Sequence, residues 1–311
     1  MSKITLPNET YLQKDFVADH IVSIMNPALE WHPLLPKVKA DSKAIWAMRE
    51  PTSAASDTAR RAPRQRTAGS KFVKVGVTAL EEVTTSLQSY GLEIRVDEDA
   101  IRYTEGIDMI DRAFNRAAYY LVNDVNSQVG AALCSGVRQL QAGDKFFDKL
   151  TPVWSNPSAD PVGDLQLLVA DMEQDEYTYE VTDVYLNKEN FDELQRWIMS
   201  LDVVKAEREE VWGLPNFKQA SVAIPVLGLT VHRTKSVPEG HLVAIDGRQP
   251  PATYYFGINP KFSAGESNDI GFNLHSYVDD DSHDTVFQFW TDFATLVKEP
   301  LAGLYYSGNK L

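Results

Sequence analysis

The residues best suited to chemistry form a cluster of imidazoles and carboxylates near the C-terminus. This cluster spans ten residues and consists of His275, Asp279, Asp280, Asp281, His283 and Asp284. Carboxylate oxygens suit Ca²⁺ or Mg²⁺ and imidazole nitrogens suit Zn²⁺, and a water bound to such an ion could support a soluble metal-dependent hydrolase. A polar turn between a strand ending at Tyr277 and a strand beginning at Thr285 explains the same residues without an ion. Both interpretations stay open, and we assign no metal ligand.

Other signatures of catalysis are absent from the sequence. It has no phosphate-cradling glycine loop, no GxSxG elbow, no HExxH and no paired CxxC. The six carboxylates between Glu81 and Asp99 could act as general acid and base, but their spacing does not select that role. The single cysteine, Cys134, cannot form an internal disulfide, and its position near a helix end favours a small packing residue. We therefore predict a protein that is not an enzyme and that needs no cofactor.

Composition indicates an acidic protein that is long enough for one large core or two linked cores. The chain has 311 residues, of which 43% are hydrophobic and 24% charged, and a formal net charge of −14. Such a balance argues against a protein that grips nucleic acid over its whole surface. The N-terminus lacks the pattern of a secretion signal, and no stretch approaches the roughly 18 apolar residues of a membrane span. We expect a protein of a reducing cytoplasm that is neither exported by that route nor inserted in a membrane.

Positive charge is concentrated in one segment. Residues 36–74 carry ten Lys or Arg against three acids, which gives +7 and leaves 20 basic and 41 acidic residues elsewhere, a body near −21. Two stretches without any Lys or Arg could receive this basic segment: residues 150–187 hold eight acids and residues 262–297 hold seven. Repulsion between acidic bodies is relieved if the basic segment of one copy lies across another. Self-assembly is therefore the first hypothesis.

We predict which residues make that contact. The basic partners are Lys43, Arg49, Arg60, Arg61, Arg64, Arg66, Lys71 and Lys74, and the acidic docking surface is Asp279, Asp280, Asp281 and Asp284. Phosphate binding, or a solvated loop without a partner, remains open for the arginines between Arg60 and Arg66. These arginines lie in a polar stretch, Glu50 to Ser70, that reads as an exposed tip. Strand patterns at Ala44–Met48 and Val73–Val77 flank it, so we expect a long hairpin that must lie on another surface.

Helical patterns organise much of the rest. The N-terminal segment predicts a short amphipathic helix, stopped by Asn26-Pro27, that needs a partner surface. Apolar residues at gaps of three or four from Ile107 to Leu133 predict a helix of about 28 residues ending by Gly136. A second helix follows Asp160-Pro161, and Asn187 caps a third.

Strand patterns account for most of the remainder. We expect strands at Tyr177–Val181, Val222–His232, His241–Ile245, Thr253–Gly257, Ile270–Tyr277, Thr285–Trp290 and Phe293–Val297, with a turn at Pro238-Glu239-Gly240. The fold class is therefore α+β.

This order of elements resembles the major capsid proteins of tailed double-stranded DNA viruses, whose fold is named after the Hong Kong phage. The similarity covers nearly the whole chain. It rests on Ser86–Val96 (SLQSYGLEIRV), on the long helix, and on the ending from Asp279 to Tyr306, where an acidic turn, an alternating strand and Pro300-Leu301-Ala302 follow one another. The resemblance is one of arrangement and carries no catalytic signature.

The resemblance implies six regions. These are an N-terminal arm (1–36), an extended loop with its return strand (37–95), a peripheral domain with the long helix as its spine (96–149), an axial domain (150–266), the long strands of the peripheral domain (267–298) and a C-terminal return to the axial domain (299–311).

The resemblance also implies a role. Hexamers and pentamers of such a protein would form an icosahedral shell around double-stranded DNA, assembled in the host cytoplasm and present in the virion, with no sequence-specific DNA binding and no membrane partner. A portal protein, a separate scaffolding protein and decoration proteins would be its partners. A cellular encapsulin-like shell of the same fold, loaded with enzyme, remains an alternative.

Overall fold

The chain folds into two compact units in the computed structural model, which describes residues 14–49, 80–97, 104–140, 154–156, 158–173, 179–200, 221–225, 227–259, 269–279 and 284–307. Unit 1 comprises Met1–Trp46, Thr84–Val129 and Thr253–Leu296, and unit 2 comprises Ala47–Val83, Gly130–Ala252 and Val297–Leu311. Each unit combines three separate stretches of sequence, so its core depends on pairing between distant segments.

The long predicted helix is confirmed as α4 (Thr104–Gly136), which begins slightly earlier than its apolar pattern. Its apolar stripe is buried: Phe114, Leu121 and Val125 are at most 4% exposed. Phe114 meets Phe287 edge to face, with ring centroids 5.3 Å apart, a favourable aromatic geometry that fixes the helix against the sheet of unit 1. No helix in the described part of the chain is both long enough and apolar enough to cross a membrane.

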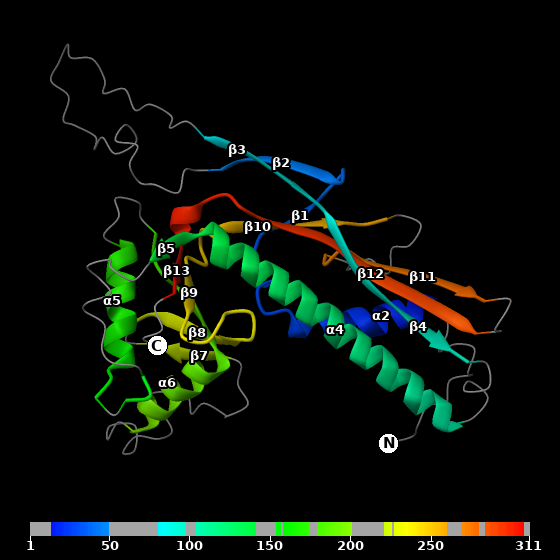
Figure 1. Cartoon of the computed structure of the whole chain (residues 1–311), viewed down its shortest axis with the longest axis horizontal. Helices are drawn as coiled ribbons and strands as arrows, with labels where there is room; N and C mark the ends of the chain where they lie inside the picture. The colour runs from blue at the N-terminus through cyan, green and yellow to red at the C-terminus, as the bar shows by residue number, and fades with distance from the viewer. Residues whose placement is uncertain are drawn as a thin grey trace, which may run out of the picture. The chain divides into compact units, whose positions relative to one another are not determined.

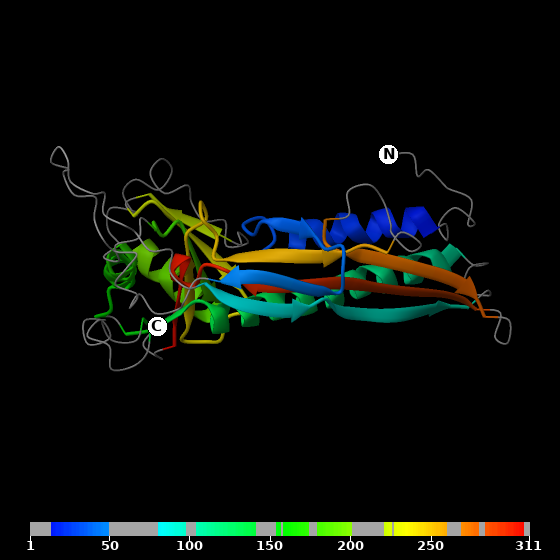
Figure 2. The same ribbon diagram turned by 90° about the horizontal axis from the view of Figure 1, so that it is seen from above.

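The sheet of unit 1 has five strands built around one long strand. Its order is β1 (Lys37–Lys39), β10 (Ala252–Gly257), β12 (Thr285–Val297) and β11 (Phe272–Val278), and β4 (Gln88–Val96) also pairs with β12. The extended-loop range expected at 37–95 therefore begins and ends in strands of this sheet. Figures 1 and 2 show α4 running along one face of the sheet.

The prediction of two strands at 285–290 and 293–297 is wrong, because β12 is continuous over 13 residues. Thr291 and Asp292 interrupt the apolar pattern, yet they pair with Tyr90 and Ser89 of β4. Thr291 also pairs with Phe272 of β11 and is fully buried. Ladder hydrogen bonds from neighbouring strands thus keep the backbone extended where side-chain polarity indicated a break.

The predicted N-terminal helix is confirmed as α2 (Lys14–Met25), followed by the short helix η1 (Asn26–Ala28) with its proline. Its partner surface lies within unit 1. Val17, Ala18, Ile21 and Met25 are at most 1% exposed, and α2 contacts β11 and lies beside α4 on the covered face of the sheet (Figures 1 and 2).

Unit 2 is built on a six-stranded sheet. Its order is β5 (Arg138–Leu140), β13 (Gly303–Tyr306), β9 (Leu242–Ile245), β6 (Asp183–Asn187), β8 (Leu229–Thr234) and β7 (Ser221–Ile224). The helical turn η3 (Pro300–Ala302) precedes β13. Strand β6 is central and buried over Asp183–Leu186, since β8 and β9 flank it.

Two capped helices complete the core of unit 2. Asp160 accepts a hydrogen bond from the backbone of Gly163 at 3.0 Å at the start of α5 (Pro161–Glu173), whose first residue is proline. The predicted cap Asn187 accepts from the backbone of Glu189 at 3.1 Å and starts α6 (Lys188–Ser200). Phe191, Leu194 and Ile198 of α6 are at most 3% exposed, and α6 contacts β6, β8 and α5.

Two strand predictions in unit 2 need correction. The strand expected at Tyr177–Val181 begins instead at Asp183, where pairing with β8 and β9 begins. The single run expected over Val222–His232 is a hairpin of β7 and β8, because Gly228 adopts a left-handed φ of 67° and reverses the chain. The predicted turn at Pro238 is confirmed, with Gly240 at φ 76°.

Candidate assembly interface

The root of the predicted basic loop is a two-stranded sheet of β2 (Ala44–Arg49) and β3 (Glu81–Ser86). The side chains of β2 alternate: Ile45 and Ala47 are 6% and 9% exposed, whereas Trp46 and Met48 are 57% and 43% exposed. One face of β2 therefore packs inward while the other presents an unburied tryptophan and methionine. The two side chains form a small exposed apolar patch at the root of the loop, and tryptophan and methionine are both enriched in protein interfaces.

The predicted basic partners are described only at this root. Lys43 is exposed and its backbone carbonyl accepts a hydrogen bond from Leu87 at 2.8 Å. Arg49 pairs with Glu81 across the two strands at 2.9 Å. Arg60, Arg61, Arg64, Arg66, Lys71 and Lys74 lie outside the described residues. Their contacts with a neighbouring copy therefore stay a prediction.

The predicted acidic docking surface lies at the end of the hairpin formed by β11 and β12. The backbone N–H of Asp279 donates to the carbonyl of Asp284 at 2.9 Å, which closes the hairpin, and Asp280 and Asp281 lie outside the described residues. The carboxylate of Asp279 pairs with Arg95 of β4 at 3.3 Å. Part of the acidic charge assigned to docking is thus balanced within the same unit.

Arg95 belongs to a small surface network that sequence reasoning missed. It also bonds Glu93 at 2.8 Å, and Glu93 accepts a hydrogen bond from Gln288 of β12. The hydrogen bonds from Gln288 and Arg95 lower the pKa of Glu93. No local signal could reveal this network, because Arg95 meets Asp279 only through the pairing of β4 and β11 with β12.

The described residues of the metal-type cluster do not converge. The ring of His275 lies beside that of Tyr277 on β11, tilted from it by 30°, with ring centroids 5.4 Å apart. Within the described ranges, no group of three or more His, Cys, Asp or Glu is placed to hold a metal ion, and His283 lies outside them. Cys134 is half-buried, and burial raises the pKa of its thiol to about 11, which makes the reactive thiolate scarce at neutral pH.

Large exposed side chains, three tyrosines and a valine, mark two further surfaces that the sequence analysis did not single out. Tyr119 and Tyr120 of α4 are 56% and 64% exposed, and Tyr277 and Val278 at the end of β11 are 37% and 60% exposed. Tyr119 and Tyr120 fall between the apolar positions Ala117 and Leu121, so the helical spacing held the signal that they face away from the core.

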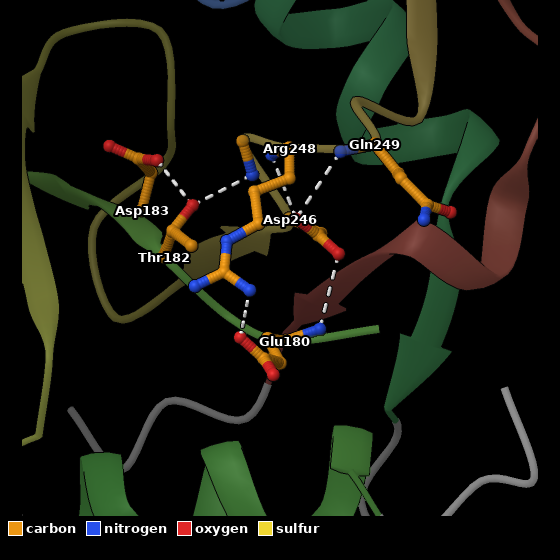
Figure 3. A network of polar contacts seen from close by, with 7 residues as sticks. Glu180, Thr182, Asp183, Asp246, Arg248 and Gln249 are labelled. Atoms are coloured by element: carbon orange, nitrogen blue, oxygen red, sulfur yellow. Dashed lines mark hydrogen bonds and ion pairs between the residues drawn. The ribbon is translucent and has the colours of Figure 1, made fainter. Parts of the chain in front are cut away.

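A buried carboxylate, Asp246, organises the turn that follows the central strand β9 of unit 2 (Figure 3). Asp246 is 2% exposed, and its two oxygens accept hydrogen bonds from the backbone of Glu180 at 3.1 Å, Arg248 at 2.8 Å and Gln249 at 3.3 Å. The side chain of Arg248 pairs with that of Glu180. These contacts fix the turn after β9 to the segment that leads into β6.

The adjacent pair Thr182 and Asp183 extends this network. The Thr182 hydroxyl accepts from the backbone of Gly247 at 2.7 Å and donates to Asp183 at 2.6 Å, while Asp183 also bonds His232 at 2.8 Å. Burial alone would raise the pKa of Asp183, but the hydrogen bonds from His232 and Thr182 outweigh burial and lower it. This geometry ties the turn after β9 to the start of β6 and to β8.

Comparison with known proteins rests on structure, because no family model and no curated protein matches the sequence. A phage-related protein from Bordetella bronchiseptica is similar at a TM-score of 0.59 and 13% identity, over 95% of this chain and 96% of that chain. The virus-like particle from Pyrococcus furiosus has a TM-score of 0.55 at 11% identity, over 94% and 97%. The capsid of the Myoviridae phage XM1 has a TM-score of 0.54 at 13% identity, over 90% and 92%. This chain has the major capsid protein fold of tailed phages.

The capsid fold accounts for nearly all of the chain, since each of these similarities covers at least 90% of both partners. The predicted α+β capsid fold is therefore confirmed. Two described surfaces of this fold carry exposed apolar side chains close to residues predicted to contact another copy. One is the face of β2 with Trp46 and Met48, next to Arg49, and the other is the end of β11 with Tyr277 and Val278, next to Asp279.

Proposed function

We propose that copies of this chain assemble as hexamers and pentamers into an icosahedral capsid shell that encloses double-stranded DNA. The single observation that carries the proposal is the capsid fold over almost the full chain, shared with a phage capsid and a virus-like particle. Assembly in the host cytoplasm, a place in the virion, and portal, scaffolding and decoration proteins as partners belong to the same proposal.

Charge segregation supports assembly through the basic loop. The segment 36–74 carries +7 on a chain of −14, so a neighbouring copy offers it an acidic surface. Two of its cations already have partners in their own chain: Lys37 pairs with Asp269 at 2.5 Å, and Arg49 pairs with Glu81. Of the predicted docking residues, Arg49 is therefore already paired, and we assign docking to Lys43 and to the predicted cations beyond the root. Exposed ion pairs contribute about 0 to 1 kcal/mol each, so they set register rather than total affinity.

Apolar burial supplies the larger contribution to affinity in this proposal. The exposed face of β2, formed by Trp46 and Met48, stands at the root of the loop and would be covered when the loop lies on a neighbour. Interfaces between proteins are enriched in tryptophan and methionine at their cores. The loop thus combines an apolar root for affinity with a charged remainder for orientation.

The proposal is tested by expressing the chain and examining it by sedimentation and negative-stain microscopy. Closed shells of uniform size are expected for the natural sequence. Reversing Arg60, Arg61, Arg64 and Arg66 to Glu is expected to block assembly, while changing the same four residues to Lys keeps the charge and serves as the matched control. Normal shells from the Glu variant would contradict the docking role, and a chain that stays monomeric at high concentration, with any partner proteins supplied, would contradict the shell itself.

A cellular encapsulin-like shell is the second candidate, favoured by the similarity to the virus-like particle from Pyrococcus furiosus. The two candidates predict the same shell and differ in content. Purified shells that carry protein cargo and no nucleic acid, judged by their absorbance ratio at 260 and 280 nm and by mass spectrometry, would select this second candidate.

A further inference from the structure

Strand β4 forms an open edge of the sheet in unit 1. Among the described strands it pairs only with β12, over the nine residues from Gln88 to Val96. Figure 2 shows β4, in cyan, along the outer edge of that sheet, on the side opposite α2. Proteins usually protect such an edge with lysine, proline or a bulge. The sequence of β4, QSYGLEIRV, contains neither lysine nor proline, so its outer backbone is open to another strand.

The hydrogen bonds of β12 show which backbone groups of β4 point outward. The N–H of Asp292 donates to the carbonyl of Gly271 at 2.9 Å, so the even-numbered residues of β12 direct their backbone groups toward β11. The odd-numbered residues direct theirs toward β4, because these groups alternate along a strand, and they pair with even-numbered residues of β4, as Phe287 does with Ile94. The N–H and C=O groups that point to the open edge are therefore those of Ser89, Gly91, Glu93 and Arg95.

We propose that β4 pairs antiparallel with β4 of a second copy across a twofold axis, so that the two five-stranded sheets become continuous. This pairing rests on the proposed function, because a closed icosahedral shell has twofold axes, at which one surface of the chain meets the same surface of a copy. A twofold contact requires a surface that is complementary to itself, and β4 meets this requirement both in charge and in apolar side chains.

The charges on β4 select one register for this pairing. Glu93 and Arg95 lie on the same face of the strand, since they are two residues apart. Two antiparallel copies centred on Ile94 place Glu93 of each copy opposite Arg95 of the other, which forms two ion pairs. Centring on Glu93 would set two carboxylates directly opposite each other, which is destabilising. Centring on Leu92 would leave both charged residues without an opposite charge.

Arg95 can serve its own chain and a neighbour at once. Its side chain is 54% exposed, and its described contacts with Glu93 and Asp279 use Nε and Nη1. A guanidinium group has five N–H donors, so the donors of Nη2 are available to a carboxylate of the second copy. The ion pairs between copies therefore need not break the network within the chain.

The opposite face of β4 is apolar and suits the same register. Phe287, which contacts Phe114 of α4, pairs with Ile94, so Ile94 and Leu92 lie on the α4 side of the sheet, where both are only partly buried. Centring on Ile94 brings this residue opposite its own copy and Leu92 opposite Val96. The two β12 strands would lie three strand spacings apart, about 14 Å, which leaves room for one α4 over each, since packed helices lie about 8–10 Å apart.

A strand of a different protein is the competing occupant, because an open edge can accept any extended segment. Self-pairing is favoured because β4 supplies both members of each ion pair and of each apolar contact. The same edge already receives a strand of the chain nearby: the N–H of Leu87 donates to the carbonyl of Lys43 at 2.8 Å, immediately before β2 begins. The pairing with a copy would continue this line of backbone hydrogen bonds.

The pairing is tested by oxidative cross-linking of full-length chains that carry one added cysteine. Ile94→Cys lies on the twofold axis, in a pair without ladder hydrogen bonds, where the two Cα atoms are about 4.5 Å apart, a distance that a disulfide spans. Leu92→Cys is the matched control, because it lies on the same face but four residues, about 13 Å, from its counterpart. Dimers on a non-reducing gel should be at least tenfold more abundant for Ile94→Cys. The natural chain, with Cys134 alone, should give none.

A second pair of variants tests the outward backbone group. In the Ile94→Cys chain, Glu93→Ala removes a carboxylate, whereas Glu93→Pro removes the same carboxylate and the outward N–H. Proline is tolerated in an edge strand where its nitrogen faces away from the ladder, and circular dichroism checks that both variants fold. The Ala variant should cross-link several-fold less than its parent, and the Pro variant should not cross-link. Equal yields from the two variants would contradict pairing through the backbone.

The outcomes separate this pairing from the capsid function. Closed shells in which Ile94→Cys gives no dimers, or no more dimers than Leu92→Cys, would overturn the pairing and leave the capsid function intact. Dimers from Leu92→Cys alone would overturn the register and the charge complementarity on which it depends. Dimers specific to Ile94→Cys in a chain that forms no shells would refute the capsid function and leave the pairing of β4 standing.

Discussion

Removing the carboxylate of Asp246 is expected to destabilise unit 2 strongly. The side chain is 2% exposed and accepts three backbone hydrogen bonds, from Glu180, Arg248 and Gln249. Asp246→Ala leaves three amides without this acceptor, and the net loss per hydrogen bond is typically about 1 kcal/mol, which sums to about 3 kcal/mol. The Arg248 and Gln249 side chains are exposed, so water can reach the turn. Water can therefore bond the amides that lose their acceptor, and the larger penalty for fully buried, unsatisfied amides does not apply.

Asp246→Asn is the matched comparison, because its amide oxygen can still accept from Arg248 and Gln249 while its NH₂ group would face the N–H of Glu180. We expect this variant to lose about 1 to 2 kcal/mol. Urea unfolding of the full chain, followed by circular dichroism at one fixed protein concentration, measures both variants, and the midpoints should fall in the order natural sequence, Asn, Ala. A urea midpoint for the Ala variant equal to that of the natural sequence would refute the stabilising role of Asp246. Equal losses of stability in the Asn and Ala variants would refute the assumption that each of the three hydrogen bonds contributes separately.

Three further outcomes are expected from unit 1 and its loop. Gly271→Ala should lower the thermal midpoint and the free energy of unfolding by at least 2 kcal/mol, because the glycine has φ 76° and a Cβ there would collide with the carbonyl of Asp292. Burial lowers the pKa of His32 from 6.5, so the unfolded chain binds the proton more readily and stability falls as pH drops below about 6.5. His32→Gln should flatten the change in urea midpoint between pH 7 and pH 5, and an unaltered pH profile would contradict this. Trp46→Ser should raise the concentration needed for shell assembly at least tenfold while leaving the monomer's circular dichroism unchanged, since the exposed indole would otherwise be buried between copies.

Local signals in the sequence sufficed for the helices. The gaps of three and four between Ile107 and Leu133 predicted α4, and an Asn side chain followed by an acidic first turn predicted α6. These features act within a few residues of one another, because a helix satisfies its own backbone hydrogen bonds and its caps complete them. The asymmetric charge of residues 36–74 is likewise a property of composition and needs no coordinates.

Strand boundaries were predicted less well, since a strand depends on a partner that lies elsewhere in the chain. The apparent break at Thr291 and Asp292 disappears because β4 and β11 pair across it. The reversal at Gly228 was hidden inside an alternating apolar run. In both cases the pairing of distant segments outweighed the local pattern.

The candidate interface, too, was only partly predictable from the sequence. Sequence reasoning identified the basic loop and the acidic hairpin, but it could not show that Asp279 is balanced by Arg95, which lies far from it in the sequence. It also could not show that Trp46 faces outward while its neighbours Ile45 and Ala47 are buried.

Residue order alone is enough to establish the spine helix, the polarity of charge and the absence of recognisable catalytic motifs, because these depend on neighbouring residues or on counts. Which carboxylates are already balanced within the chain, as Asp279 is by Arg95, emerges only once the segments are packed. Exposure and pairing are set by contacts between residues that can be hundreds of positions apart, and such contacts leave no mark in a local stretch of sequence.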